Sequence, residues 1–122
     1  MDVFRKIVLA LALAMVATTH ARAAELVMLE RPGCVWCARF DEEIAPAYPK
    51  TEQGRRAPLR RVDITEAWPD DLEGIAGERI TPAFLLIARG EEIGRIRGYP
   101  GDEFFWYRLD ELIAKLDQPE HP

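Results

Sequence analysis

Apolar positions along the chain follow two periods, and each period predicts one kind of secondary structure. Continuous apolar runs, or alternation with a period of two, predict four strands, over residues 26–29, 59–64, 83–88 and 93–97. Apolar residues three and four positions apart predict two helices that each bury one face. These residues are Cys37, Phe40, Ile44 and Tyr48 in the first helix and Phe105, Leu109, Leu112 and Leu116 in the second.

Turn-forming residues set the expected ends of the first helix. Residues 31–33 read Arg-Pro-Gly and follow the first strand, so the helix is expected to begin at or near Cys34. Pro46 and Pro49 are expected to kink or end it. Residues 53–54, Gln-Gly, are expected to begin a loop.

A third, shorter helix completes the predicted topology. Residues 68–72 are typical of a loop that enters a helix, which ends near Gly74 or Gly77. Residues 89–92 predict a polar hairpin turn between the last two strands. The order is then β-α-β-α-β-β-α, an α/β fold with a mixed four-stranded sheet flanked by helices. Residues 24–122 form this single domain.

Residues 1–23 have the composition of a secretory signal peptide. Arg5 and Lys6 precede an apolar run over residues 7–17, and the Ala-Arg-Ala at 21–23 is a small-x-small cleavage site. Cleavage is predicted after Ala23. The alternative is a retained membrane anchor, but the apolar run is much shorter than the about 20 residues that cross a bilayer.

Length, charge and the supply of metal ligands exclude several classes of protein. At 122 residues, the chain is too short for a multidomain enzyme. Its 16 Lys+Arg against 21 Asp+Glu give a formal net charge of −5, with no basic block for nucleic acid. Two Cys and two His, one of them in the signal segment, do not make a closed four-ligand zinc site. Four arginines are expected on solvated faces of edge strands, namely Arg60, Arg61, Arg95 and Arg97.

The chemistry of the chain is concentrated in a pair of cysteines, Cys34 and Cys37, at the start of the first helix. Unpaired N–H groups and the positive end of the helix dipole favour a thiolate at Cys34, so its pKa is expected to lie below the about 8.5 of free cysteine. Cys37 belongs to the apolar face of the helix and is expected to point inward. Cys34 is therefore the expected nucleophile, and Cys37 the thiol that resolves a mixed disulfide with a partner.

Two other roles of the same cysteines explain the sequence less well. A purely structural Cys34–Cys37 disulfide closes too small a loop to stabilise the fold much. A carrier of Cu(I) or another thiophilic metal also uses two thiolates. Such carriers usually have Met two residues before the first Cys, where this chain has Pro32, and they have the strand order βαββαβ. Metal binding through the two sulfurs is the alternative function.

The first strand, the dithiol at a helix start, and Ile80-Thr81-Pro82 before an apolar strand and hairpin resemble the thioredoxin superfamily, over residues 25–116. The resemblance implies a thiol:disulfide oxidoreductase, and no cofactor is expected. It also implies that Pro82 follows a cis peptide bond beside the dithiol and that Thr81 offers its backbone to a partner strand. A trans proline that merely starts a strand is the alternative, because cis is the minority form of X–Pro bonds.

Four segments are more specifically similar to SoxS-type periplasmic thioredoxins of bacterial sulfur oxidation, namely residues 25–28, 32–39, 44–49 and 98–101. This similarity implies a monomeric periplasmic reductase that keeps or restores the thiol of a sulfur-carrier protein, SoxYZ. It also implies electron supply from a membrane thiol transporter of the CcdA/DsbD kind. Tyr99 is placed near the substrate groove, although a packed aromatic residue at a strand end is the alternative for it.

The sequence departs from ordinary thioredoxins at two places. Val35-Trp36 replaces Gly-Pro between the cysteines, and Met28 stands six residues before the first Cys, where a buried Asp is usual. Strong oxidants of the DsbA type carry His at the position of Trp36, which favours a reductase here. Trp36 is expected to lie exposed as a contact surface for substrates rather than to fold over the core. Glu30 is the nearest carboxylate in sequence and is expected to be solvated.

Overall fold

The computed structural model describes residues 2–7 and 24–118 of the chain. Four strands form one sheet of order β2-β1-β3-β4. They are Glu25–Glu30 (β1), Leu59–Asp63 (β2), Ala83–Ala88 (β3) and Glu91–Arg97 (β4). β1 runs parallel to β2, whereas β3 is antiparallel to both β1 and β4. The mixed four-stranded sheet expected from the apolar patterns is confirmed.

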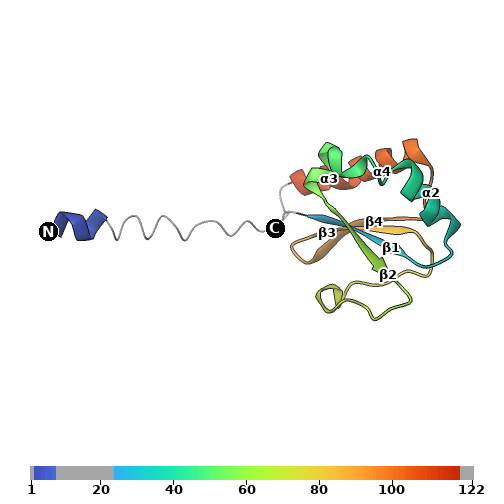
Figure 1. Ribbon diagram of the computed structural model, residues 1–122, viewed down its shortest axis with the longest axis horizontal. Coiled ribbons are helices and arrows are strands. Elements are labelled where there is room, and N and C mark those ends of the chain that lie inside the picture. Colours follow the sequence, from blue (N-terminus) through green and yellow to red (C-terminus); the bar gives the residue numbers. More distant parts are fainter. Residues whose placement is uncertain (1, 8–23, 119–122) are drawn as a thin grey trace.

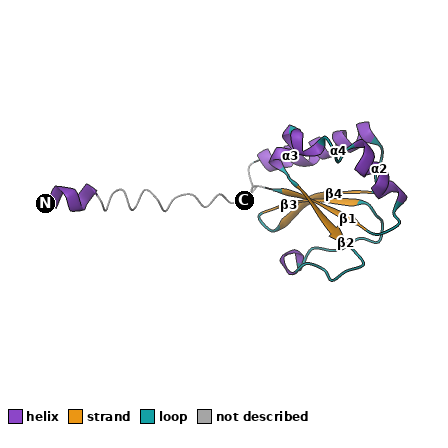
Figure 2. Ribbon diagram, viewed as in Figure 1, coloured by secondary structure: helices purple, strands orange, loops and turns teal. Residues whose placement is uncertain are grey.

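Figures 1 and 2 show that the two faces of this sheet are covered differently. One face carries the α-helices, which are Val35–Glu43 (α2), Glu52–Arg56 (α3) and Asp102–Ala114 (α4). The other face is covered by the connection between β2 and β3, residues 64–82, which contains a 3-10 turn at Asp70–Leu72 (η2). Two more 3-10 turns are Tyr48–Lys50 (η1) and Lys115–Asp117 (η3).

The expected loop at Gln53-Gly54 is wrong, because these residues lie inside α3. The hydroxyl of Thr51 accepts the N–H of Gly54 at 3.0 Å and so caps the helix at its N-terminus. Gly54 itself lies so close to Tyr48 that an added Cβ would stand 1.8 Å from the Tyr48 carbonyl oxygen. Glycine at this position therefore serves close packing and does not break the helix.

Two other helix expectations need smaller corrections. The helix expected after residues 68–72 is only the 3-10 turn η2. As expected, α2 begins directly after Cys34, but it ends at Glu43, before either proline. Tyr48 reaches the core from η1 instead of from the end of α2.

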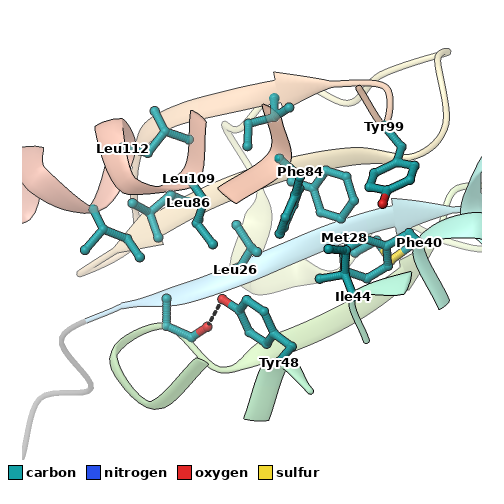
Figure 3. Close-up of a cluster of buried hydrophobic side chains, with 14 of the residues drawn as sticks. Leu26, Met28, Phe40, Ile44, Tyr48, Phe84, Leu86, Tyr99, Leu109 and Leu112 are labelled. Atoms are coloured by element: carbon teal, nitrogen blue, oxygen red, sulfur yellow. Dashed lines mark hydrogen bonds between the residues drawn. The ribbon is translucent and has the colours of Figure 1, made fainter. Parts of the chain in front are cut away.

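The face below the helices holds an aromatic cluster, which we call the helical core and which Figure 3 shows. The ring of Phe40 lies 4.7 Å from that of Phe84 and 5.2 Å from that of Phe105, measured between centroids. Leu26 and Met28 from β1 complete the centre of this cluster, and neither is exposed. Large rings buried in contact contribute heavily to stability. This face therefore holds the larger of the two buried clusters of the sheet.

The opposite face holds a smaller cluster, which we call the loop core. Its buried strand residues are aliphatic, with Leu29 and Leu85 fully buried. The 64–82 connection closes it through buried Leu72 and partly buried Trp68. The indole Nε1 of Trp68 donates to the carbonyl of Leu72 at 2.9 Å and so ties this part of the connection to itself.

Most of the predicted signal segment lies outside the described residues. Residues 2–7 form a helical segment, and the apolar run beyond residue 7 and the cleavage site after Ala23 are not among the residues the structure describes. Across 2–7 and 24–118, no helix has the length and apolar character that a bilayer crossing requires.

Candidate active site

The dithiol lies where β1 passes into α2. The turn at residues 31–33 separates the strand from the helix, and Gly33 takes a backbone φ of 76°, in the left-handed region that glycine adopts most easily. Cys34 is the N-cap of α2, and its Sγ accepts the backbone N–H of Cys37 at 3.1 Å. The sulfur thus already binds one of the N–H groups that a helix start leaves without a partner.

The two sulfurs form a disulfide but differ in their surroundings. The Cα atoms of Cys34 and Cys37 lie 5.2 Å apart. Cys37 is 5% exposed and belongs to the helical core with Phe40, whereas Cys34 is half-buried at the edge of that core. An open groove of about 520 Å³ runs past both cysteines, with Pro32 and Val35 among its lining residues. The expected inward orientation of Cys37 is confirmed.

Thr81 and Pro82 lie directly beside the dithiol. The Thr81–Pro82 peptide bond is cis, as the resemblance implied. The hydroxyl of Thr81 is within hydrogen-bond distance of Cys34 Sγ, at 3.3 Å, and is placed to donate to it. Sequence reasoning assigned Thr81 only a backbone role and missed this side-chain contact. The signal available was a hydroxyl residue directly before the proline expected beside the cysteines.

Trp36 lies on the outer surface of α2 and is 53% exposed. The guanidinium of Arg39 is 5.6 Å from the centre of the indole, a cation–π distance. Arg39 in turn forms an ion pair with Glu43 at 3.0 Å, one turn further along α2. Val35 and Ile80 are also largely exposed. The expectation that Trp36 lies on the surface is confirmed.

Tyr99 lies in the helical core and is only 8% exposed. Its ring packs edge-on against Phe40, with centroids 6.0 Å apart, and its hydroxyl donates to Glu43 Oε2 at 2.6 Å. This hydrogen bond, followed by that from Arg39, holds the pKa of Glu43 below its ordinary value. Burial, with the bond to Glu43, raises the pKa of Tyr99. The geometry favours the packed-aromatic alternative for the ring of Tyr99.

Two carboxylates near the dithiol, Glu30 and Asp41, are paired with an arginine. Met28, at the position of the usual buried Asp, is fully buried and apolar. Arg61 donates to Glu30 at 2.7 Å and to Asp41 at 2.7 Å, so it joins β1, β2 and α2 behind the cysteines. Glu30 and Asp41 both line the groove beside Cys37. Glu30 is therefore half-buried and ion-paired, which differs from the solvated residue expected from sequence.

Of the two arginines of β4, one differs from expectation. Arg95 is not on a solvated face: its side chain is 15% exposed and pairs with Glu78 and Glu92. Arg97 is 65% exposed, as expected, but it too pairs with Glu78. Within residues 2–7 and 24–118, no group of three or more His, Cys, Asp or Glu side chains is arranged to hold a metal ion.

Comparison with solved structures identifies similar proteins, although no protein-family model and no curated protein matches the chain. The periplasmic thioredoxin SoxS from Paracoccus pantotrophus, in its reduced form, is 46% identical, with a TM-score of 0.73; the match covers 77% of this chain and 99% of that protein. Thioredoxins from Malassezia sympodialis and Halobacterium salinarum are each 19% identical with TM-scores of 0.56, and support the fold alone. They cover 76% and 80% of this chain, and 77% and 79% of their own chains.

The comparison and the geometry agree. The similarity to SoxS covers nearly the whole length of that protein, and in this chain the CxxC pair occupies the helix start beside a cis-proline. The chain therefore belongs to the thioredoxin superfamily of thiol:disulfide oxidoreductases and resembles its SoxS-type members.

Proposed function

We propose that this oxidoreductase works as a reductase of protein disulfides, with Cys34 as nucleophile and Cys37 as resolving thiol. The observation that carries the proposal is the unequal burial of the two sulfurs. Cys34 caps a helix at the edge of an open groove and has the Thr81 hydroxyl within hydrogen-bond distance, while Cys37 lies beneath it in the helical core. The accessible sulfur is the one whose thiolate the surroundings favour.

The reaction moves two electrons from the dithiol to the substrate. The Cys34 thiolate attacks one sulfur of a substrate disulfide; the new S–S bond forms as the substrate's own bond breaks, and the released thiolate takes up a proton from water. Cys37 then loses its proton and attacks Cys34 Sγ. This second exchange releases the other substrate sulfur as a thiol and leaves the Cys34–Cys37 disulfide that the structure contains.

The dipeptide between the cysteines supports the reducing direction. Reduction potentials of CxxC proteins span about −270 to −120 mV and rise as the thiolate is better stabilised. Strong oxidants carry a His directly before the second cysteine, and this chain has Trp36 there. The indole supplies no positive charge next to the sulfurs, which leaves the thiolate less stabilised than in an oxidant.

The place of action that we propose is the periplasm, after removal of residues 1–23. Support comes from the signal-like sequence and from the similarity to a periplasmic thioredoxin. N-terminal sequencing of exported protein tests it: a chain that begins at Ala24 supports cleavage after Ala23, and an intact Met1 contradicts it. The partner we propose is a sulfur-carrier protein of the SoxYZ type, whose thiol this oxidoreductase keeps or restores. A membrane thiol transporter of the CcdA/DsbD kind then reduces the Cys34–Cys37 disulfide of the oxidoreductase itself.

Disulfide trapping tests the function directly. The wild type should reduce insulin, and Cys34→Ser should not, because the nucleophile is lost. Cys37→Ser should hold a substrate as a stable mixed disulfide, which mass spectrometry identifies in the native host. If Cys37→Ser captures no protein and the wild type instead binds one Cu(I) tightly, the alternative role as a metal-binding protein is correct.

A further inference from the structure

The backbone just before the cis-proline is poorly attached to the rest of the fold. The N–H of Ile75 donates to Leu72, and the carbonyl of Pro82 accepts the N–H of Gly98 at 2.8 Å. Within residues 24–118, no hydrogen bond between backbone groups involves any residue from 76 to 81. This segment nevertheless ends in the threonine whose hydroxyl reaches Cys34.

Side chains of β4 supply the missing attachment. Arg95 Nη2 donates to the carbonyl of Ala76 at 3.0 Å, and Arg95 Nη1 donates to Glu78 Oε1 at 3.1 Å. Arg97 donates to the same Glu78 oxygen. We call Glu78, Arg95 and Arg97 the loop clamp. Glu92 holds the other side of the Arg95 guanidinium.

Two of the three residues of the loop clamp are partly desolvated, and both of its arginines lie on a strand that is paired with β3. The side chains of Glu78 and Arg95 are 11% and 15% exposed. Ion pairs with this little exposure are screened less by solvent than surface pairs, and loss of one partner leaves the other charge poorly satisfied. Arg95 and Arg97 lie opposite Leu85 and Ala83 on β3, so they occupy the face of the sheet that the connection covers.

We propose that Glu78 and Arg95 are positioning residues that hold Thr81 against Cys34 and fix the conformation of the adjoining Ile80 for substrate polypeptides. Without the clamp, segment 76–81 gains conformational freedom. The Thr81 hydroxyl then spends less time at the sulfur, which weakens the stabilisation of the thiolate. A substrate chain that docks beside exposed Ile80 must also order the segment, which weakens binding.

Alkylation of reduced protein by iodoacetamide at pH 6 tests the link to Thr81 without reference to any substrate. Glu78→Gln should slow alkylation of Cys34 about threefold, because a smaller fraction of the sulfur is thiolate. Thr81→Val should slow it at least as much, and the double variant should be no slower than Thr81→Val alone, since the first change acts through the second residue. Additive slowing, or wild-type alkylation in Glu78→Gln, overturns the proposal.

Two further variants test whether slower alkylation comes from loss of the loop clamp or from a general loss of structure. Arg95→Lys keeps the charge but cannot reach Glu78 and the Ala76 carbonyl together, so it should slow alkylation as Glu78→Gln does. Asp117→Asn removes the 2.6 Å ion pair between Asp117 on η3 and Arg56 on α3, and should leave the rate unchanged. Equal slowing in Asp117→Asn would show that any lost ion pair has this effect, which contradicts a specific role for the clamp.

The substrate part of the inference rests on the proposed reductase function and has its own readout. Glu78→Gln should raise KM for insulin about threefold relative to its KM for cystamine, which is too small to dock along Ile80. Equal KM changes for the two disulfides overturn this part. If the wild type does not reduce insulin, the reductase proposal fails, and the alkylation series still decides whether the clamp positions Thr81.

Discussion

The two faces of the sheet are built in different ways, and the active site draws on both. The cysteines Cys34 and Cys37 lie at the helical core, and Thr81 and Pro82 end the connection that covers the other face. The helical core joins large aromatic rings from α2, β3 and α4 at centroid distances of about 5 Å. The loop core is smaller and aliphatic, and the connection over it depends on polar side-chain contacts. Cys37 is embedded in the first, whereas Thr81 ends the segment that crosses the second.

This difference separates stability from reactivity. Dense packing fixes the dithiol, so damage to the helical core should unfold the protein. The 76–81 segment contributes few buried groups, so damage there should leave the protein folded and alter the chemistry at Cys34. Regions with few buried contacts are generally those whose local opening requires the least free energy.

Glycine substitutions give the largest contrast between the faces. Gly54→Ala in α3 places a Cβ 1.8 Å from a backbone oxygen of Tyr48, so it should destabilise the fold by about 3 kcal/mol or more. Gly77→Ala places its Cβ in ordinary contact, 3.7 Å from the ring of Trp68, and should cost less than about 0.5 kcal/mol. Urea unfolding measures both. Similar losses for the two variants would contradict the comparison.

A buried hydrogen bond gives the next effect. The Tyr48 hydroxyl donates to the Ala57 carbonyl at 2.7 Å, the hydrogen bond drawn at Tyr48 in Figure 3. Both residues are fully buried. Tyr48→Phe leaves that carbonyl without this donor and should cost about 1–3 kcal/mol in urea unfolding. Tyr107→Phe is the matched control, since Tyr107 is 62% exposed and the change should be nearly neutral.

A smaller effect is expected on the outer surface of α2. Arg39→Gln removes the cation–π contact with Trp36, worth about 0.5–1 kcal/mol at an exposed site. The indole should then move more freely, which raises the quenching of its fluorescence by the neutral quencher acrylamide, while the unfolding free energy falls by no more than about 1 kcal/mol. Trp68→Phe and Trp106→Phe in the background isolate the signal of Trp36. Unchanged quenching would show that Arg39 does not fix the indole.

The smallest expected effect is on the free energy of unfolding at low pH. Hydrogen bonds from Arg97 and then Arg95 hold the pKa of Glu78 below its ordinary value of 4.5. The folded protein thus binds this proton more weakly than the unfolded chain, so the stabilisation is present above about pH 4.5 and is lost as the pH falls through the folded value. Urea unfolding at stepped pH should show a shallower acid loss in Glu78→Gln than in the wild type. The same dependence of the unfolding free energy on pH in the two proteins would contradict this prediction.

The parts of the molecule that sequence predicts are those that local periodicity determines. The strands and the start of α2 at Cys34 follow from apolar spacing and a turn, which act over a few residues. The helix at Gly54 was missed because its glycine is explained by a close approach to Tyr48, which no local pattern reveals.

The cysteines of the site could be predicted from the sequence, whereas the contacts of the residues around them could not. The contact of Thr81 with Cys34 joins residues 47 positions apart, and that of Arg95 with Glu78 joins residues 17 apart. Arginine on an edge strand is usually solvated, so sequence favoured the wrong environment for Arg95. Its burial depends on the path of the 64–82 connection, which carries too little regular structure to be predicted.

The central claim is that Cys34 is an accessible sulfur held as a thiolate, with Cys37 protected beneath it. The most direct measurement is the rate of iodoacetamide alkylation of the reduced wild type from pH 4 to pH 10, with the modified residue identified by mass spectrometry. We expect modification of Cys34 alone, with an apparent pKa at or below about 7.5. An apparent pKa of about 8.5, with Cys37 modified as fast as Cys34, would contradict it.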